Sequence, residues 1–386
     1  MKQKTIGILT GGADVPALNA ALRAVTIRAT KEGYHVLGIV NGWNGLINID
    51  QSRKINEQVF CRTMNIDSTH SLQRKGGTVL GTSRIIPNMV KIEDVPDHLK
   101  DKYNNPENDL TEEVLKNIEY LEIDTLIVIG GLNTLTYAAS LHKLGVKIIA
   151  IPKTMDNNIN GSDYSLGFST CVTRTVQYTH QLRTCASSHH NFLIVEVFGR
   201  YAGFSSIIPC ITGAADRCLI PEHPFDVEEI TELLVEDRKN GLNNYSILIT
   251  SEGATPTTGY QNSNDPDKNW RGIGRWLRGQ LEEISPKFNN GRKISAIDQH
   301  LGYMVRSGDP DAVDSIVAVA FGNLAINLLT SGKTGTMVSL MKSRYEYRPI
   351  GIITSGKKTV DVSKFYDSKR YRPRFTNIED KPMWIL

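Results

Sequence analysis

Short apolar runs that lead into glycine turns and then into amphipathic segments recur along this chain. The first run covers residues 5–9 and is followed by a turn at Gly11 and Gly12. Strands of this kind alternate with helical patterns, which is typical of a parallel sheet covered by helices and therefore of an α/β protein. The strands predicted in the first part are residues 5–9, 35–40, 124–129 and 146–151, and the helices are residues 16–30 and 132–144.

The same alternation starts again near residue 192. A chain of 386 residues is long enough for two domains, since one domain takes roughly 100–200 residues. We therefore expect two α/β lobes, and we predict surface loops at residues 97–109 and 258–267. The basic and aromatic segment after Ser355 has no clear place in this scheme. The predicted strands are residues 192–197, 217–220, 245–250 and 336–341, and the helices are residues 202–211, 227–240, 269–284 and 311–329.

Composition argues against several functional classes. The net charge of +3 is too small to indicate a nucleic-acid partner. No apolar run approaches the roughly 18 residues of a membrane span, and the first residues do not have the pattern of a signal peptide. The five cysteines are odd in number and lack CxxC spacing. These features predict a cytoplasmic protein with reduced thiols and with no nucleic-acid or membrane partner.

Three glycine-rich turns are candidates for phosphate binding. They are TGGADVPALN at residues 10–19, GGTVLGTSR at residues 76–84 and GGLNT at residues 130–134. Backbone N–H groups at a strand-to-helix turn, together with the helix dipole, favour an anion. Arg84 can bind a phosphate oxygen through its guanidinium. Each turn taken alone is equally compatible with a plain glycine turn.

The segment PKTMDNN at residues 152–158 follows an apolar strand directly. An acid at Asp156 can accept a proton from an attacking hydroxyl. Lys153 and Thr154 can stabilise a phosphoryl group during its transfer. The alternative is an Asx-rich turn that only caps the sheet.

Three further segments place a charged residue beside a glycine. They are EVFGRYAG at residues 196–203, SEGA at residues 251–254 and LGYMVRSG at residues 301–308. Each alone is compatible with a solvated surface charge. Most of the seven segments fall at predicted strand ends, where open α/β sheets bind ligands.

Taken in order, these segments resemble the phosphofructokinase family, whose pattern is GGGDxPGLN, GGTxLGTSR, GGDGS or GGDDS, PKTIDND, SSHHR with EVMGRxAG, SEG and LGHxQRGG. The resemblance runs from about Thr5 to about Ile352. It implies two Rossmann-like lobes with mainly parallel sheets and an active site in the cleft between them. It also implies a homodimer or homotetramer and Mg²⁺-dependent phosphoryl transfer from ATP or pyrophosphate to a sugar hydroxyl. The donor-binding lobe would be residues 1–168 with 304–355, and the acceptor-binding lobe residues 169–303 with 356–386.

The resemblance also assigns roles to individual residues. Asp156 matches the general base, and Arg84 and Arg200 match arginines that bind the transferring phosphate. Glu252 matches the carboxylate that binds sugar hydroxyls. The predicted catalytic residues are Asp156, Thr154, Arg200, Arg84 and Lys153; the donor-binding residues are Gly11, Gly12, Ala13, Gly131, Asn133 and Thr134; and the acceptor-binding residues are Glu252, Phe198, Gly199, Arg306, Tyr303 and Asn191.

Three departures from the family pattern concern the metal and the phosphates. The magnesium-associated aspartate of GGD is Leu132, which cannot hold a cation. The second aspartate of TIDND is Asn158, and a glycine of the phosphate loop is Ala13. We therefore expect Mg²⁺ as a cofactor but assign no residue as its ligand, because Leu132 stands where the family has the aspartate.

Other departures concern the phosphate of the sugar. Two arginines of the family are replaced by Asn191 and Ile297, and the histidine of LGH is replaced by Tyr303, which leaves Arg306. Each charge-assisted hydrogen bond that is lost weakens binding by roughly 1.5–3 kcal/mol, so two arginines are worth about two to four decades in affinity. This favours an acceptor other than fructose 6-phosphate, such as an unphosphorylated sugar, a cyclitol or a nucleoside.

Other interpretations remain open. Asn133 has the bulk of the aspartate that accompanies pyrophosphate use, without its charge, so both ATP and pyrophosphate are candidate donors. Leu132, Asn158 and Ala13 favour a different class, a non-catalytic homologue that binds a metabolite and regulates an active partner. A distant lipid or NAD kinase shares a GGDG-type loop, but the full order of the segments argues against it.

Overall fold

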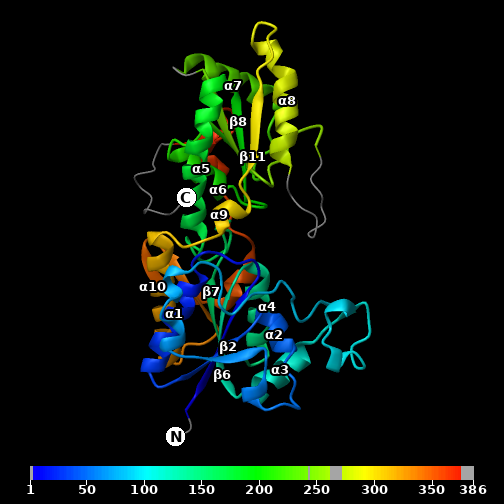
Figure 1. Ribbon diagram of the computed structural model, residues 1–386, viewed down its shortest axis with the longest axis vertical. Coiled ribbons are helices and arrows are strands. Elements are labelled where there is room, and N and C mark those ends of the chain that lie inside the picture. The colour runs from blue at the N-terminus through cyan, green and yellow to red at the C-terminus, as the bar shows by residue number, and fades with distance from the viewer. Residues whose placement is uncertain (1–2, 242–243, 261–271, 375–386) are drawn as a thin grey trace. The chain divides into compact units, whose positions relative to one another are not determined.

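A computed structural model describes residues 3–241, 244–260 and 272–374. The chain divides into two compact units (Figure 1). The first contains Met1–Thr154, Ile159–Gly167 and Ser307–Gly356, and the second contains Met155–Asn158, Phe168–Arg306 and Lys357–Leu386. The sequence-based boundary at residue 168 had put Met155–Asn158 in the first lobe, whereas its contacts group it with the second unit. Parts of the predicted loop 258–267, the predicted helix 269–284 and the acceptor-lobe segment 356–386 lie outside the described residues.

The first unit is built on a seven-stranded sheet. Its inner pairs are parallel, and the pairs at both edges are antiparallel. Both faces of the inner strands are covered, which is why they read as continuous apolar runs in the sequence. The strand order is β13 (Arg344–Pro349), β12 (Thr336–Met341), β7 (Ile148–Pro152), β6 (Ile123–Gly130), β1 (Thr5–Gly11), β2 (His35–Ile39) and β3 (Cys61–Met64).

Helices cover the two faces of this sheet (Figure 1). On one face α1 (Leu18–Lys31) packs against α10 (Ala312–Thr330). The other face carries α2 (Gly42–Ile47), α3 (Thr111–Tyr120) and α4 (Leu132–Lys143), whose apolar side chains form one cluster with those of the sheet.

Helix α10 is the one described helix that is long and apolar enough to cross a membrane by length and composition alone. It packs against α1, β7, β12 and β13. Its buried Asp314 accepts hydrogen bonds from the Tyr164 hydroxyl and, at 2.8 Å, from the Gly167 N–H. These contacts account for its apolar composition as that of a core helix.

The second unit contains a four-stranded, all-parallel sheet. Helix α5 packs against α6, and α7 packs against α8. Asp226 caps α7, because its carboxylate accepts the N–H groups of Glu228 and Glu229 at 2.8 and 2.9 Å. The strand order is β11 (Ala296–His300), β8 (Phe192–Val197), β10 (Ser246–Ser251) and β9 (Arg217–Leu219), and the helices are α5 (Phe168–His189), α6 (Phe204–Ile211), α7 (Val227–Asn240), α8 (Ile273–Phe288) and α9 (Tyr303–Arg306).

Some elements were not predicted. Helix α5 has 22 residues, but its sequence is rich in threonine and shows no clear apolar stripe. Thr175 and Thr179 are buried, and their hydroxyls donate to carbonyls one turn back. Residues 97–109, predicted as a loop, contain a short strand. The smaller elements are β4 (Val90–Lys91), β5 (Glu107–Asn108), α11 (Val362–Phe365), β14 (Tyr366–Asp367), β15 (Arg372–Pro373) and 3₁₀ turns at Ile55–Glu57, Asp67–Thr69, Leu72–Arg74, Ile92–Asp94, Asp97–Leu99 and Ile350–Ser355.

A buried ion pair in the second unit offers a test of this packing. The Arg217 Nε and Nη2 atoms donate to the two Asp237 carboxylate oxygens at 2.6 and 2.7 Å, and its Nη1 donates to the Arg370 carbonyl at 2.6 Å. Asp237→Ala leaves a buried guanidinium without its carboxylate, so we expect the free energy of unfolding to fall by about 3 kcal/mol. Denaturant unfolding beside the exposed control Glu232→Ala measures this, and equal stability of the two variants would contradict it.

Candidate active site

In the first unit, the turn after β1 is tied to the loop at residues 76–84. Gly12 has a φ of 81°, a conformation that favours glycine. Its N–H donates to the Ser83 carbonyl at 2.8 Å, and the Thr82 hydroxyl donates to the Gly12 carbonyl at 2.6 Å. The first two glycine-rich segments therefore meet at the carboxyl end of β1, next to Ala13 and the exposed Arg84.

Asn19 holds the same loop from the first turns of α1. Its side-chain amide donates to the carbonyls of Lys75 and Gly76 at 3.1 and 3.0 Å, and its side-chain oxygen accepts the Val79 N–H at 2.7 Å. Asn19 is buried. The last residue of the first segment therefore positions the second.

The third segment lies where β6 meets α4. Gly131 is the N-cap of α4, and Asn133 is exposed. Thr134 is buried against Gly11, since a Cβ on Gly11 would lie 2.5 Å from the Thr134 methyl carbon. Leu132 packs against the apolar cluster formed by α2, α3, α4 and the sheet. The side chain at the family's aspartate position thus contributes to the core.

Lys153 follows β7 and is buried, with 3% of its surface exposed. Its backbone N–H donates to the Gly130 carbonyl at 2.9 Å, and its ammonium donates to the Ala13 carbonyl. The N–H of Thr154 donates to the Leu166 carbonyl at 3.1 Å. Lys153 therefore brings a positive charge to the turn at Gly12 and Ala13.

The described residues offer no ready-made site for a protein-bound Mg²⁺. Within residues 3–241, 244–260 and 272–374, no three His, Cys, Asp or Glu side chains are grouped as a metal site requires. Mg²⁺ takes oxygen ligands, commonly one or two carboxylates together with substrate phosphates, and Leu132 offers none. We therefore derive no chemical step through a metal.

In the second unit, backbone hydrogen bonds join the loops that follow β8 and β10. The Glu252 N–H donates to the Val197 carbonyl at 2.9 Å, and the Gly253 N–H donates to the Gly199 carbonyl at 3.2 Å. A Cβ on Gly253 would lie 2.0 Å from the Arg200 carbonyl oxygen, so only glycine permits this approach. The contact brings the Arg200 Nε within 4.0 Å of a Glu252 carboxylate oxygen.

The loop after β8 is also held by a hydrogen bond from α6. The Phe198 carbonyl accepts a hydrogen bond from the Ser205 hydroxyl, and the Phe198 side chain is buried. Phe198, Gly199, Arg200 and Glu252 therefore form one rigid group at the carboxyl ends of two neighbouring strands.

Asp156 belongs to this second unit by its contacts. Burial raises the pKa of its carboxyl from 3.8 to about 6, and the nearby positive charge of Arg200 opposes the rise. A carboxyl that loses its proton near pH 6 is able to act as a base at neutral pH.

Tyr303 and Arg306 lie in α9, which follows the carboxyl end of β11. The Arg306 guanidinium lies 4.8 Å from the centre of the Tyr303 ring. Tyr303 is 55% exposed, whereas Arg306 is 8% exposed. The aromatic ring at the family's histidine position thus covers the remaining arginine.

Asn191 and Ile297 lie at the other end of these strands. Asn191 precedes β8, and Ile297 pairs with Leu193 near the start of β11. Arg306 follows the end of β11. The grouping of Asn191, Ile297, Tyr303 and Arg306 around one phosphate is therefore not formed within a single chain, because a parallel strand separates its two ends by about 3.3 Å per residue.

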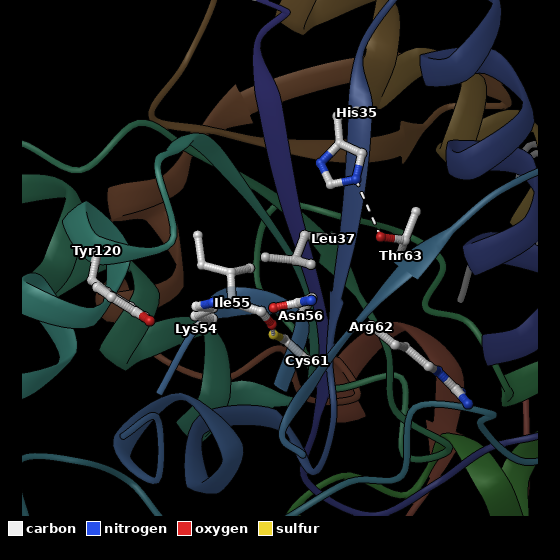
Figure 2. Close-up of a pocket in the computed structure, with 9 residues that line it drawn as sticks. All are labelled: His35, Leu37, Lys54, Ile55, Asn56, Cys61, Arg62, Thr63 and Tyr120. Carbon is white, nitrogen blue, oxygen red and sulfur yellow. Dashed lines mark hydrogen bonds between the residues drawn. The ribbon is translucent and has the colours of Figure 1, made fainter. Parts of the chain in front are cut away.

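A pocket of about 780 Å³ lies elsewhere, beside β2 and β3 of the first unit (Figure 2). His35 and Thr63 meet there at 3.3 Å. None of the predicted site residues is among the nine that line it: His35, Leu37, Lys54, Ile55, Asn56, Cys61, Arg62, Thr63 and Tyr120.

From the raised pKa of Asp156 we predict how the free energy of unfolding changes with pH. Between pH 3.8 and about 6 the folded chain holds a proton on Asp156 that the unfolded chain releases, so this group's stabilisation is present below that range and is lost as the pH rises through about 6. Asp156→Asn has no charge to bury. We therefore expect its free energy of unfolding, relative to the unchanged protein, to increase by up to about 3 kcal/mol from pH 4 to pH 7.

Denaturant unfolding at several pH values measures this difference, with the exposed Asp101→Asn as a control. A difference for Asp156→Asn that does not change with pH would show that the carboxyl is ordinary.

Comparison with protein families matches residues 5–329 to the family described as Phosphofructokinase. The chain is 33% identical to ATP-dependent 6-phosphofructokinase 3 of Streptomyces coelicolor over 342 residues, which covers 87% of this chain and 90% of that protein. It is 32% identical to the pyrophosphate–fructose 6-phosphate 1-phosphotransferase of Amycolatopsis methanolica, with 87% of this chain and 90% of that protein covered.

Solved structures agree on the fold. The pyrophosphate-dependent phosphofructokinase from Marinobacter aquaeolei matches 96% of this chain and 89% of its own, with a TM-score of 0.75 and 18% identity. The phosphofructokinase from Saccharomyces cerevisiae matches 91% of this chain and 45% of its own, with a TM-score of 0.71 and 21% identity. Since the family match covers most of the chain and two α/β units carry the motifs at their strand ends, the chain belongs to the phosphofructokinase family.

Proposed function

We propose that this chain is a phosphotransferase that moves a phosphoryl group from ATP or pyrophosphate to a hydroxyl group of a sugar or related polyol. One observation carries the proposal. Asp156 is a half-buried acid whose pKa is raised to about 6 by the loss of solvation, near the positive charge of Arg200. An acid with a raised pKa near an arginine is suited to proton removal and phosphoryl transfer.

In the proposed reaction the Asp156 carboxylate accepts the proton of the acceptor hydroxyl. The hydroxyl oxygen forms a bond to the terminal phosphorus of the donor, and the bridging P–O bond breaks, so that ADP or phosphate leaves. Arg200 neutralises charge on the phosphoryl oxygens. Glu252, held 4.0 Å from Arg200, orients the acceptor through its hydroxyl groups.

We assign donor binding to the first unit. The turn at Gly11, Gly12 and Ala13 and the N-terminus of α4 supply backbone N–H groups, and Lys153 and Arg84 supply positive charge. Relatives at similar identity carry the names of both ATP-dependent and pyrophosphate-dependent enzymes. Both donors therefore stay in the proposal, and the exposed Asn133 is the position that we expect to discriminate between them.

The acceptor is proposed to differ from fructose 6-phosphate. The related proteins are named for that sugar phosphate, but this chain has Asn191, Ile297 and Tyr303 where the family pattern has two arginines and a histidine. A pocket with less positive charge favours an uncharged sugar, a cyclitol or a nucleoside.

A second candidate function is a non-catalytic member that binds a metabolite. The observation that favours it is Leu132, a partly buried side chain that packs against the core cluster where the family pattern has a magnesium-associated aspartate. This candidate differs from the first in one measurable way, because a ligand would stabilise the protein without any turnover.

The proposal also includes a homodimer or homotetramer in the cytoplasm, as the family resemblance implies. No disulfide joins the cysteines within the described residues, which is compatible with that location.

A transfer assay tests the proposed reaction. ATP and pyrophosphate are offered separately, with Mg²⁺ in the buffer, to fructose 6-phosphate and to a panel of sugars, cyclitols and nucleosides. We expect turnover with at least one pair, and an acid limb in the pH profile near pH 6. Asp156→Ser is expected to reduce turnover by at least about 100-fold, since a general base contributes about 10²–10⁴.

Asp101→Ser is the matched control, because this acid is exposed. Retained activity in Asp156→Ser would remove Asp156 from the role of base, and silence across the whole panel would favour the metabolite-binding function.

Restoring the missing arginines tests the acceptor. We expect Asn191→Arg with Ile297→Arg to tighten fructose 6-phosphate binding by about tenfold or more, which is at least 1.4 kcal/mol. Both positions lie at the amino ends of their strands, so a gain would mean that the sugar phosphate meets them on a second copy of the chain. A titration measures binding, with Asn191→Gln and Ile297→Val as the neutral control, and unchanged affinity would count against the depleted pocket.

A further inference from the structure

The segment after Gly356 is part of the second unit and docks on its functional loops. The Lys358 N–H donates to the Asn158 carbonyl at 3.0 Å, two residues after Asp156. The Val360 N–H donates to a Glu222 carboxylate oxygen at 2.8 Å. The family-based assignment of site residues gave this segment no role.

Glu222 joins this segment to the loop that follows β8. Its carboxylate accepts the Gly203 N–H at 3.0 and 3.1 Å in addition to the Val360 N–H. Further along, the Tyr366 hydroxyl donates to the Cys218 carbonyl at 2.7 Å, and the Cys218 N–H donates to the Tyr371 carbonyl at 2.8 Å. The segment is therefore anchored at Lys358 and at several residues that follow it, as part of the fold.

Two lysine side chains of this segment lie against the loop that carries Arg200. The Lys357 ammonium lies 3.2 Å from the centre of the Tyr201 ring, and the Lys358 ammonium lies 5.0 Å from the centre of the Phe204 ring. Cation–π contacts of this kind hold an ammonium group in place. Tyr201 comes directly after Arg200 and is 40% exposed. Lys357 is also exposed, so a ligand can reach it, whereas Lys358 is half-buried.

Lys357 and Lys358 place two positive charges on the segment that lies against Tyr201 and Phe204, which follow Arg200 in the chain. Asp361, the acid that follows them, accepts a hydrogen bond from the Ser363 hydroxyl and lies 2.9 Å from the Lys364 ammonium. Glu252 lies 4.0 Å from Arg200 in the same group of loops. Lysine ammonium groups on such a loop favour a phosphate.

We propose that Lys357 and Lys358 bind phosphate oxygens beside Arg200, as a phosphate-binding element that the C-terminal segment brings to the loop of Asp156. The inference rests on the proposed function, because it names the group that this site takes. The ligand is a phosphate ester or phosphoanhydride, and it belongs either to the donor or to a phosphorylated acceptor. The two lysines supply positive charge in a chain that has lost arginines elsewhere.

The test measures equilibrium binding to the full-length chain, without any need for turnover. The probes are inorganic pyrophosphate, fructose 6-phosphate and uncharged fructose, each titrated by calorimetry at two salt concentrations. For the double variant Lys357→Gln with Lys358→Gln, we expect binding of at least one phosphate probe to weaken by about tenfold per lysine, which is about 1.4 kcal/mol each. We also expect its affinity to depend less on salt, and fructose binding to stay unchanged.

Two controls separate charge from folding. Lys364→Gln removes a lysine of the same segment that is paired with Asp361, and we expect its phosphate binding to stay at the original level. Lys357→Arg with Lys358→Arg keeps both charges and should retain binding. Loss with the arginine pair as well would overturn the proposal, because it would indicate a structural role.

The outcomes also separate this inference from the proposed reaction. If the original chain binds phosphate without any turnover, and the double glutamine variant loses that binding, the result supports the inference. The same result counts against the proposed reaction only. Turnover together with equal phosphate binding in the original chain and the double variant overturns the inference alone. A loss confined to pyrophosphate assigns the lysines to the donor, and a loss confined to fructose 6-phosphate assigns them to the acceptor.

Discussion

Parallel pairing of neighbouring strands is the constraint on which both groups of site residues depend. In the second unit Val197 pairs with Ser251, so the loops that carry Arg200 and Glu252 begin side by side. In the first unit Gly11 pairs with Gly130, and Gly130 with Pro152. The turns that follow therefore start at one level, and a lysine far along the chain reaches the turn after β1. Hydrogen bonds between loops then fix what the strand register has brought together.

Within the second unit, burial and charge act on Asp156 in opposite directions. Burial alone raises the pKa of the carboxyl, because a charge in a poorly solvated place is unfavourable. Arg200 lowers it, and the outcome of about 6 leaves the group ionised at neutral pH but still basic enough to take a proton. Arg200 is in turn placed by the close approach of Gly253 to its carbonyl. The backbone contact at Gly253 thus helps to place the charge that opposes the rise in the pKa of Asp156.

The sequence predicts what depends on local pattern and misses what depends on distant contacts. The apolar runs of β1 and β6 and the helix 227–240 were readable, because periodicity and the capping Asp226 are local signals. Helix α5 was not, since three of its seven buried residues are threonines and its sequence shows no clear apolar stripe. Motif order identified Lys153 and Asp156, but the bond from Lys153 to Ala13 joins residues far apart in the chain. For the same reason no spacing rule pointed to Lys357 or Lys358.

The residues of the candidate site differ in their effect on the stability of the fold. Leu132 exchanges a carboxylate for a partly buried apolar side chain that packs against the core cluster, so that change favours folding. Asp156 has the opposite character, since an ionised carboxyl with a pKa of about 6 makes the folded state less stable at neutral pH. An asparagine would fill the same space without burying a charge. Stability alone would favour the replacement of Asp156. A destabilising charge near Arg200 is therefore expected where function requires it. This difference favours the catalytic function over the non-catalytic one.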